Sequence, residues 1–454
     1  MKTITAERLA QVTGGEILCG DRSVEASKVS TDTRTITAGS VFVALRGDRF
    51  DANRFAPQAA CEGASILVVE RWEGEFPPNA AVVKVADGLV ALQGLARDQR
   101  MKREMPVVGI TGSNGKTSTK DFARSVLSQQ YEVAATKGNL NNHIGVPLTV
   151  LSIEEEHEAA VVEMGMNHAG EIAPLCEIAR PNLGIITNIG TAHIEHLGSR
   201  EGIAEEKGAL ARALPENGAL LIPAGCDFYE YFQSRTKARV IPVGNGRGVV
   251  RAEELRQERG CSKFILVIED ESVAEVEIPV IGRHMVKNAL LAAGCGWFLG
   301  MKPETIARGL AVTQMTSGRL RRYQSGGVTV FDDTYNANPE SMAAAIDTLA
   351  EAPVAEGGQR LVVLGPMGEL GDFAAEAHRQ VGRLAAERGL SIVAVGEGAE
   401  GIVEGAGCGD FYPDPTVAVK ELSGRLKSGD LALFKASRSA AMEKIMNEVF
   451  PQNN

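Results

Sequence analysis

Short apolar runs alternate with helical stretches over most of this chain, and no other feature constrains the fold as strongly. From Met105 onward, polar loops or helices follow the runs "MPVVGI", "AAVVEM", "LGIITNI" and "GALLIP". Beyond Thr316 the alternation resumes with "VTVFDD", "RLVVLG", "LSIVAVG" and "LALFKA". The pattern predicts mostly parallel sheets covered by helices, and residues 251–279 are expected to add further strands.

At 454 residues the chain is too long for a single ordinary core. Its first part mixes short strands, such as "SVFVAL" and "ASILVVE", with polar loops, and the glycine-rich "TSGRLRRYQSGG" beginning at Thr316 is typical of a domain boundary. We therefore predict an α/β protein of three domains. These are a small α/β domain at residues 1–100, a central parallel-sheet domain at 101–315, and a Rossmann-like doubly wound domain at 316–454.

The composition excludes several classes of function. A net charge of −11 argues against a general nucleic-acid binder. No apolar run approaches the roughly 18 residues of a transmembrane helix, and the start, "MKTITAERLAQVTGG", lacks the apolar centre of a signal peptide. Seven scattered cysteines without a C-x-x-C pair indicate reduced thiols. We expect a cytoplasmic protein that binds no nucleic acid and does not insert into a membrane.

A glycine-rich turn lies in "GITGSNGKTSTKDF", residues 109–122. A helix N-terminus and successive backbone N–H groups attract phosphate oxygens, a lysine adds positive charge, and a following threonine can bind magnesium. Ile110 stands where the full phosphate-loop pattern has its first glycine, so this loop is a shorter variant. The predicted nucleotide-binding residues are Thr111, Gly112, Ser113, Asn114, Gly115, Lys116, Thr117 and Ser118.

The alternative interpretation of this stretch is an ordinary turn. Its context favours a nucleotide site, because an apolar strand precedes the turn and an amphipathic helix with Phe122, Val126 and Leu127 on one face follows. A second glycine-rich stretch, "GEGAEG" at residues 396–401, matches the pattern of dinucleotide sites. Glu397 and Glu400 would place negative charge beside a pyrophosphate, so we predict a simple strand-to-helix turn there.

Polar side chains gather after several predicted strands, where ligands bind in sheets of this kind. Glu163, at the end of one strand, is either a magnesium ligand or a solvated strand-end carboxylate. Five loops carry more amide and charge than a turn requires: "ATKGNLNNHIGVP", "TNIGTAHIEHLGS", "FDDTYNANPESM", "VLGPMGELG" and "FKASRSAAME". Each could be turn chemistry. Together they predict a cleft between domains that holds a large polar substrate.

These strings resemble the Mur ligases of cell-wall precursor synthesis. "STDTR", "GDRFDANRF", "GNLNNHIGVP", "EMGMNHAGEI", "TNIGTAHIEHLGS", "GRHMVKNA", "YNANPESM" and "SRSAAME" occur in the family's order over nearly the whole chain. The phosphate loop is shared with folylpolyglutamate synthases. "GNLNN" and "YNANPESM" are similar to the member that adds D-alanyl-D-alanine to UDP-N-acetylmuramoyl-tripeptide.

The resemblance implies an ATP-dependent amide ligase of peptidoglycan precursor synthesis that forms an acyl phosphate and releases ADP and phosphate. ATP and Mg²⁺ would be its cofactors, small molecules its substrates, and a monomer its active form. Lys116 would hold the β- and γ-phosphates, while Thr117, Glu163 and His193 would bind magnesium. Because imidazole suits softer metals, the residues alone favour a hydrogen-bonded loop role for His193.

The resemblance also implies that Lys207, in "EEKGAL", is a catalytic lysine carbamylated by carbon dioxide, which requires a lowered pKa. The residues alone indicate a solvated helix face there. Asn288, Arg319 and Asp333 would contact the nucleotide. The UDP-sugar would meet Ser30, Thr31, Asp32, Thr33, Arg34, Arg49 and Asp51, and the sugar-peptide Asn139, Asn141 and Asn142. The dipeptide would meet Tyr335, Asn336, Asn338, Ser437 and Arg438.

Some positions depart from the family's pattern: Met285, Pro366, Ala436, Ala209 and Pro223 replace an asparagine, an aspartate, a glycine, a glutamate and an asparagine. None belongs to the phosphate loop, but they weaken the adenine and dipeptide assignments. Two alternatives stay open: a related ligase with another acceptor, and a catalytically silent protein that binds the nucleotide or the UDP-precursor.

Overall fold

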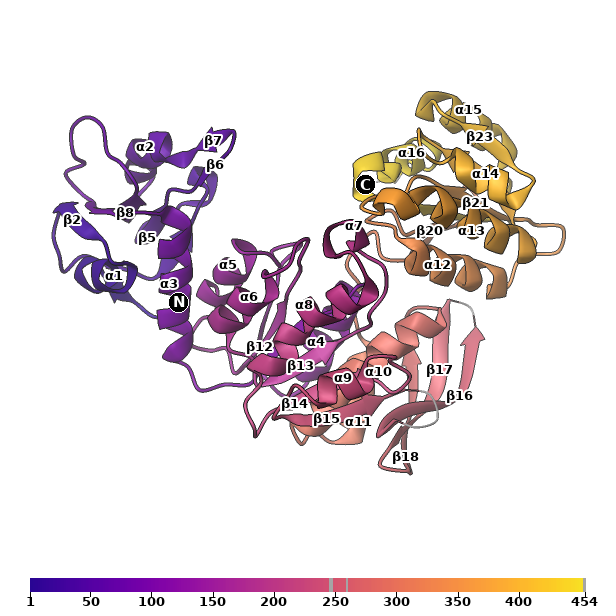
Figure 1. Ribbon diagram of the computed structural model, residues 1–454, viewed down its shortest axis with the longest axis horizontal. Helices are drawn as coiled ribbons and strands as arrows, with labels where there is room; N and C mark the ends of the chain where they lie inside the picture. Colours follow the sequence, from indigo (N-terminus) through magenta and orange to yellow (C-terminus); the bar gives the residue numbers. More distant parts are fainter. Residues whose placement is uncertain (245–247, 259, 452–454) are drawn as a thin grey trace.

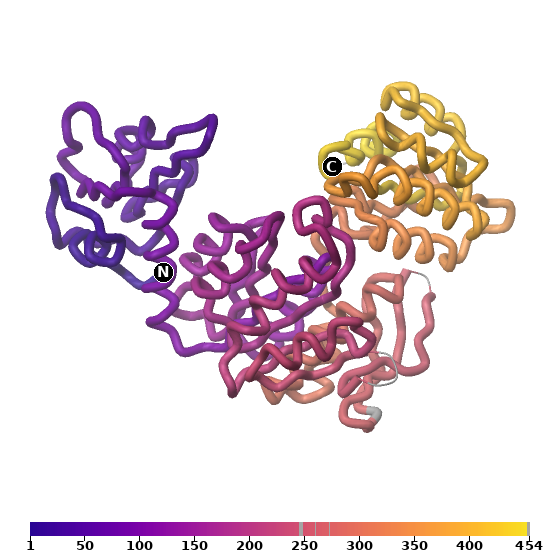
Figure 2. Tube along the Cα trace, viewed as in Figure 1, coloured from indigo at the N-terminus to yellow at the C-terminus, as the bar shows by residue number. Residues whose placement is uncertain are grey.

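The computed structural model describes residues 1–244, 248–258 and 260–451. Figure 1 shows three α/β domains arranged as an open V with the central domain at its base. Each domain is built around one main sheet, and Figure 2 shows that each comes from one contiguous part of the chain. The predicted three-domain α/β fold is confirmed. Among the helices that the structure describes, none combines the length and apolar composition needed to cross a bilayer.

The N-terminal domain has a five-stranded sheet in the order β2-β9-β8-β5-β4, parallel except for β2. Its strands are β2 (Glu16–Cys19), β4 (Lys28–Ser30), β5 (Ser40–Val43), β8 (Ala64–Val69) and β9 (Ala81–Lys84), and its helices are α1 (Ala6–Thr13), α2 (Ala56–Cys61) and α3 (Gly88–Met101). Two small ladders join β1 (Ile4–Thr5) to β3 (Glu25–Ala26) and β6 (Arg46–Gly47) to β7 (Phe50–Asp51).

The central domain has nine strands in the order β11-β12-β10-β13-β14-β15-β16-β17-β18. The parallel strands are β10 (Val107–Thr111), β11 (Val133–Ala135), β12 (Ala159–Glu163), β13 (Leu183–Ile186), β14 (Ala219–Pro223) and β15 (Arg239–Val243). The expected extra strands are confirmed as β16 (Val250–Glu258), β17 (Cys261–Ile268) and β18 (Glu271–Ile278). The helices are α4 (Lys116–Leu127), α5 (Gly145–Leu151), α6 (Ile172–Ala179), α7 (Ile194–Leu197), α8 (Arg200–Ala213), α9 (Tyr229–Gln233), α10 (Arg283–Phe298) and α11 (Pro303–Ala311).

The C-terminal domain has a six-stranded sheet in the order β19-β20-β24-β21-β22-β23, with β19 antiparallel to the rest. Its strands are β19 (Arg321–Ser325), β20 (Val328–Asp332), β21 (Arg360–Leu364), β22 (Ser391–Val395), β23 (Asp410–Tyr412) and β24 (Leu431–Lys435). Its helices are α12 (Pro339–Glu351), α13 (Ala374–Glu387), α14 (Glu400–Ala406), α15 (Pro415–Arg425) and α16 (Met442–Val449). "GEGAEG" is the predicted strand-to-helix turn, between β22 and α14.

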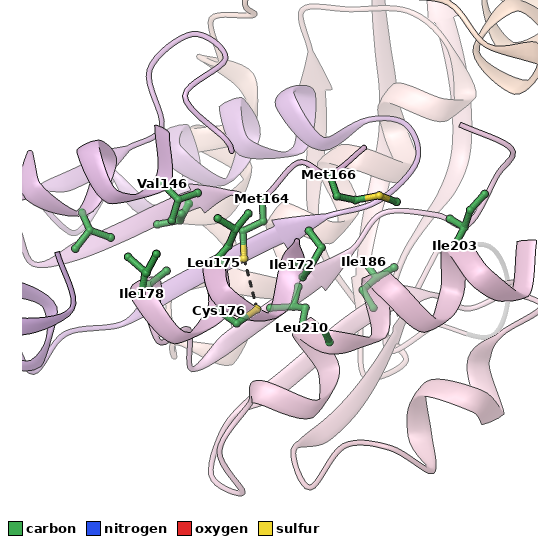
Figure 3. Close-up of a cluster of buried hydrophobic side chains, with 14 of the residues drawn as sticks. Val146, Met164, Met166, Ile172, Leu175, Cys176, Ile178, Ile186, Ile203 and Leu210 are labelled. Atoms are coloured by element: carbon green, nitrogen blue, oxygen red, sulfur yellow. Dashed lines mark hydrogen bonds between the residues drawn. The ribbon is translucent and has the colours of Figure 1, made fainter. Parts of the chain in front are cut away.

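The parallel strands β10, β12, β13 and β14 in the middle of the central sheet are covered on both faces, which explains why they are apolar almost throughout. Successive side chains point to opposite faces: in β12, Val162 packs with α5, α6 and α8, whereas Val161 packs with α4, α10 and α11. Figure 3 shows the first of these cores, where the Cys176 thiol lies 3.7 Å from the Met164 sulfur. On the opposite face, Phe122 and Val126 of α4 are fully buried, as the amphipathic pattern predicted.

Strand register positions the loops that matter for function. Ile110 of β10 pairs with Glu163 of β12, and Thr111 pairs with Ile186 of β13. All three strands are parallel, so their carboxyl ends meet at one edge of the sheet. The glycine-rich turn, Glu163 and the loop at residues 187–193 therefore lie together there.

The core around α4 gives a first prediction. Replacing the fully buried Phe122 with alanine removes a large apolar side chain and leaves a cavity. We expect Phe122→Ala to lower the free energy of unfolding of the central domain by about 3–5 kcal/mol. Urea denaturation followed by circular dichroism measures the change. Val312→Ala, at a side chain of the central domain that is 57% exposed, is the control and should cost less than about 0.5 kcal/mol. Equal losses in both variants would contradict the described core.

Candidate active site

A cleft of about 840 Å³ lies between the central and C-terminal domains, and all five polar loops line it. Its lining includes most of the predicted site residues: Ser113, Asn114, Gly115, Lys116, Thr117, Ser118, Asn139, Asn141, Asn142, Glu163, His193, Asn288, Arg319, Asp333, Tyr335, Asn336, Asn338, Ser437 and Arg438. Thr111 is fully buried at the end of β10, and Gly112 follows it. No residue of "GEGAEG" lines this cleft.

The glycine-rich turn is tight enough to require glycine at two positions. Gly112 has φ 148°, and a Cβ there would lie 1.8 Å from the hydroxyl oxygen of Thr187. Gly115 has φ 77°, and a Cβ there would lie 2.6 Å from Oδ1 of Asn288. The turn thus leads directly into the N-terminus of α4, a geometry that suits an anion.

The loop at residues 187–193 holds the turn in shape. The backbone oxygen of Asn188 accepts a hydrogen bond from the Ser113 N–H at 3.1 Å, and its side-chain oxygen accepts one from the Asn114 N–H at 2.8 Å. The Gly190 N–H donates to the Ser113 hydroxyl at 2.9 Å. Sequence reasoning missed these supports. The string "TNIG" after β13 was the available signal, but it does not show which loop it braces.

Two lysines approach the turn. The Nζ of Lys116 donates to the backbone oxygen of Gly112 at 2.7 Å, and desolvation lowers the pKa of this lysine although Glu163 opposes the shift. Lys207, in α8, is only 1% exposed. Burial, helped by the positive charge of Lys116, lowers the pKa of Lys207 well below its ordinary value. The solvated helix face expected from "EEKG" is therefore wrong at Lys207, since α8 turns this side chain inward.

A hard cation would find suitable oxygen donors beside the turn. Glu163 is 2% exposed; its Oε1 accepts a hydrogen bond from the Asn141 amide at 2.8 Å, and its buried Oε2 has no protein partner among the described residues. Thr117 offers a hydroxyl in the same cleft. No group of three His, Cys, Asp or Glu side chains in the described parts of the chain could hold a metal by itself.

His193 is held in the left-handed region, with φ 65°. Its Nδ1 lies 2.5 Å from a carboxylate oxygen of Glu369, which belongs to the C-terminal domain, and this contact holds the pKa of the Glu369 carboxyl below its usual range. Glu369 was not predicted as a site residue. Its string "GELG" was identified as a polar loop, but the pairing with His193 depends on how the domains meet.

The C-terminal domain contributes a charged group of its own. A guanidinium nitrogen of Arg319 donates to the Thr117 hydroxyl at 3.1 Å, and the same guanidinium lies 3.9 Å from the centre of the Tyr335 ring. Asp333 accepts a hydrogen bond from Nζ of the buried Lys435 at 2.6 Å. Lys435, at the end of β24, is a further site residue that sequence reasoning missed. Arg319 thus reaches the hydroxyl that would bind a cation.

The predicted UDP-sugar residues do not line this cleft. Ser30, Asp32 and Arg34 lie beside β4 in the N-terminal domain, where the Arg34 guanidinium pairs with Asp32 at 2.6 Å. Arg49 is exposed between β6 and β7, and Asp51 pairs with Arg71 at 2.5 Å. Thr31 and Thr33 lie in the same N-terminal loop.

Comparison with known proteins bears directly on this architecture. The family model for the Mur ligase middle domain matches residues 110–296, and the model for the Mur ligase glutamate ligase domain matches residues 318–438. The UDP-N-acetylmuramoyl-tripeptide–D-alanyl-D-alanine ligase of Bacillus subtilis is 37% identical over 93% of this chain and 92% of its own length. The chain belongs to the Mur ligase family.

Further relatives share the same name or fold. The UDP-N-acetylmuramoyl-tripeptide–D-alanyl-D-alanine ligase of Escherichia coli is 36% identical over 98% of both chains. Among solved Mur ligases, MurF of Acinetobacter baumannii has a TM-score of 0.91 at 34% identity, with both chains fully covered. MurF of Thermotoga maritima, solved with ADP, has a TM-score of 0.83 at 28% identity and covers 93% of this chain and 97% of its own.

The burial of Lys207 in this Mur ligase gives a second prediction. In the folded protein the pKa of Lys207 lies below the ordinary 10.5. At pH values between these two pKa values, the unfolded chain therefore binds more protons than the folded protein does. The free energy of unfolding consequently rises with pH over that range. Each unit of lowering costs about 1.4 kcal/mol at neutral pH. In bicarbonate-free buffer, Lys207→Met should therefore raise the free energy of unfolding at pH 7, and the gain should shrink as the pH approaches 10.5. Urea titrations at several pH values measure it. A variant no more stable than the parent at pH 7 would contradict the burial cost.

Proposed function

We propose that this chain uses ATP to join D-alanyl-D-alanine to UDP-N-acetylmuramoyl-tripeptide, releasing ADP and phosphate. The observation that carries the proposal is the glycine-rich turn with Lys116, placed in a cleft between two domains. The relatives that match the whole chain carry this activity in their names, and the Thermotoga maritima neighbour was solved with ADP.

The chemistry of such a ligation defines what the site must do. A carboxylate is a poor electrophile in water, so an oxygen of the peptide carboxylate first bonds to the γ-phosphorus of ATP, and ADP leaves. The amine of the dipeptide then attacks the acyl carbon, and phosphate leaves from the tetrahedral intermediate. The protein supplies position and charge stabilisation. Lys116 and the N–H groups of the turn would hold the β- and γ-phosphates, with the Lys116 ammonium leaving the Gly112 carbonyl for a phosphate oxygen.

The C-terminal domain completes this site. Arg319 reaches Thr117 across the domain boundary, so its charge would lie beside the phosphates only when the domains are docked. Docking would also exclude water from the reactive acyl phosphate. Asp333, fixed by Lys435 and by the Leu320 N–H at 3.1 Å, would contact the nucleotide from the same side. Asn288, packed beneath Gly115, would contact the adenine.

Magnesium fits this site. The unpartnered, buried carboxylate oxygen of Glu163 and the hydroxyl of Thr117 are oxygen donors of the type that Mg²⁺ prefers, and His193 would lie beside them. When bound, the ion would spread the negative charge of the phosphoryl oxygens. Glu369 would then orient the His193 imidazole from the C-terminal domain.

Lys207 is the proposed carbamylation site. A neutral amine is the form that reacts with carbon dioxide, and the lowered pKa of this lysine favours that form. The carbamate would place an anion beside Lys116, so that attraction would replace the repulsion between two ammonium groups.

We also propose roles for the three predicted domains. Residues 1–100 would bind the UDP-sugar through the loops around Ser30–Arg34, Arg49 and Asp51; residues 101–315 would bind ATP and, through Asn139, Asn141 and Asn142, the sugar-peptide. Residues 316–454 would bind the dipeptide through Tyr335, Asn336, Asn338, Ser437 and Arg438. We also propose a cytoplasmic monomer, and its seven free cysteines fit a reducing compartment.

Among the departures from the family pattern, Met285 touches a proposed nucleotide contact. Its sulfur lies 3.9 Å from the amide nitrogen of Asn288. Ala209 and Ala436 are buried, and the side chain of Pro366 lies near Gly396 and Gly398. Met285 also lines the cleft, so the proposed adenine contact has a thioether beside it where the family pattern has an asparagine amide.

The reaction gives a third prediction. Phosphate release from ATP should require both UDP-N-acetylmuramoyl-tripeptide and D-alanyl-D-alanine, and Lys116→Ala should lower it by at least about a hundredfold. Circular dichroism should show an unchanged fold, because Lys116 is the first residue of α4 and its side chain lines the cleft rather than an apolar core. Lys302→Ala, at an exposed lysine before α11, is the control. Turnover with another acceptor, binding without turnover, or near-normal activity of Lys116→Ala would each overturn the proposal.

Carbamylation gives a fourth prediction. With ¹³C-bicarbonate, the parent protein should show a carbamate carbon resonance that Lys207→Ala lacks. Lys207→Ala should lose most activity, bicarbonate should restore it poorly, and small carboxylic acids should restore part of it by replacing the missing anion. Full activity of Lys207→Ala without any addition would argue against a catalytic carbamate.

A further inference from the structure

The N-terminus of α12 makes close contacts across the domain boundary that the proposed reaction does not explain. The two carboxylate oxygens of Glu340 accept hydrogen bonds from Thr191, one from its backbone N–H at 2.8 Å and one from its hydroxyl at 3.0 Å. A Cβ at Gly190 would lie only 3.0 Å from the Glu340 carboxyl carbon. The absence of a side chain at Gly190 lets the carboxylate reach the loop.

Asn338 makes the neighbouring contact. Its side-chain oxygen caps α12 by accepting from the Ser341 N–H at 2.9 Å, and the Ser341 hydroxyl accepts from the Asn338 N–H at 3.0 Å. This capping box orients the Asn338 amide nitrogen, which donates to the side-chain oxygen of Asn114 in the phosphate-binding turn at 2.8 Å. One helix end thus contacts the turn directly and, through Glu340, the loop that braces the turn.

The loop at residues 187–193 connects these contacts. Gly190, which donates to the Ser113 hydroxyl, is adjacent to Thr191, which donates to Glu340. His193 follows two residues later. We propose that Glu340 is a positioning residue that couples docking of the C-terminal domain to the shape of the phosphate-binding turn.

The negative charge of the Glu340 carboxylate strengthens its two hydrogen bonds with Thr191. Hydrogen bonds that an ionised carboxylate accepts are shorter and stronger than neutral ones, and here one carboxylate accepts two. A second cross-boundary carboxylate on α12 gives a contrast: Glu351 approaches Arg283 at 3.6 Å, with side chains 47% and 73% exposed. An exposed pair of this kind contributes little.

A purely local role for Glu340 is the alternative. An acidic residue in the first turn of a helix is stabilised by the helix dipole without any partner. That role would affect the stability of α12, but it would leave the Thr191 backbone unchanged. Exchange of the Thr191 amide hydrogen therefore separates the two.

Hydrogen exchange resolved to single amides tests the proposal on the full chain. In Glu340→Ala the protection factor of the Thr191 amide against hydrogen exchange should fall at least about tenfold. In Glu351→Ala this protection factor should stay unchanged. Glu340→Gln should retain most protection, because its amide oxygen can accept from the Thr191 N–H and its amide nitrogen can donate to the Thr191 hydroxyl. An unprotected Thr191 amide in the parent protein, or equal protection in Glu340→Ala and the parent, would overturn the proposal.

Kinetics provide a second measurement, which rests on the proposed function. Glu340→Ala should lower kcat at least about tenfold with little change in KM for the UDP-linked peptide, and Glu340→Gln should stay within about threefold of the parent. Thr191→Val combined with Glu340→Ala should be no slower than Glu340→Ala alone, because both remove one interaction. Additive losses would contradict the coupling. A parent protein without ligase activity would refute the function, while the exchange result would still decide the role of Glu340.

Discussion

The register of three parallel strands is the constraint on which the rest of the structure depends. Backbone hydrogen bonds fix β12, β10 and β13 side by side, so segments far apart in the chain end at the same edge. The glycine-rich turn, Glu163 and the loop that carries His193 meet there as a consequence. A shift of one residue in the pairing register of a strand would turn every core side chain of that strand to the opposite face of the sheet. The two separate cores of the central domain therefore protect the geometry of the site.

The protein itself only partly compensates the charged groups at this edge of the central sheet. Lys116 and Lys207 approach each other, both with lowered pKa values, and the buried carboxylate of Glu163 has an unpartnered oxygen. Such an arrangement costs stability in an isolated fold. Functional sites commonly carry a stability cost of this kind, and the proposed phosphates, cation and carbamate would offset part of it.

Much of the fold follows from the sequence because its causes are local or periodic. The parallel strands in the middle of the central sheet are apolar almost throughout because helices cover both faces, and the turn after Thr111 carries its glycines where positive φ values require them. Lys207 could not be placed in this way, since "EEKG" does not state which side of α8 is buried. The roles of Lys435, Glu369 and Glu340 were equally hidden, because each depends on a partner in another strand or domain.

Each of the three main sheets is built from its own stretch of chain, and Figure 2 shows the three domains following one another along the chain. During synthesis the N-terminal domain can therefore fold while the ribosome is still translating the next one. The cleft differs, since its lining runs from Ser113 to Ser439. Nascent chains would thus carry two folded domains without a complete cleft until the C-terminal domain has also been made, which leaves the phosphate-binding turn open to solvent in the interval.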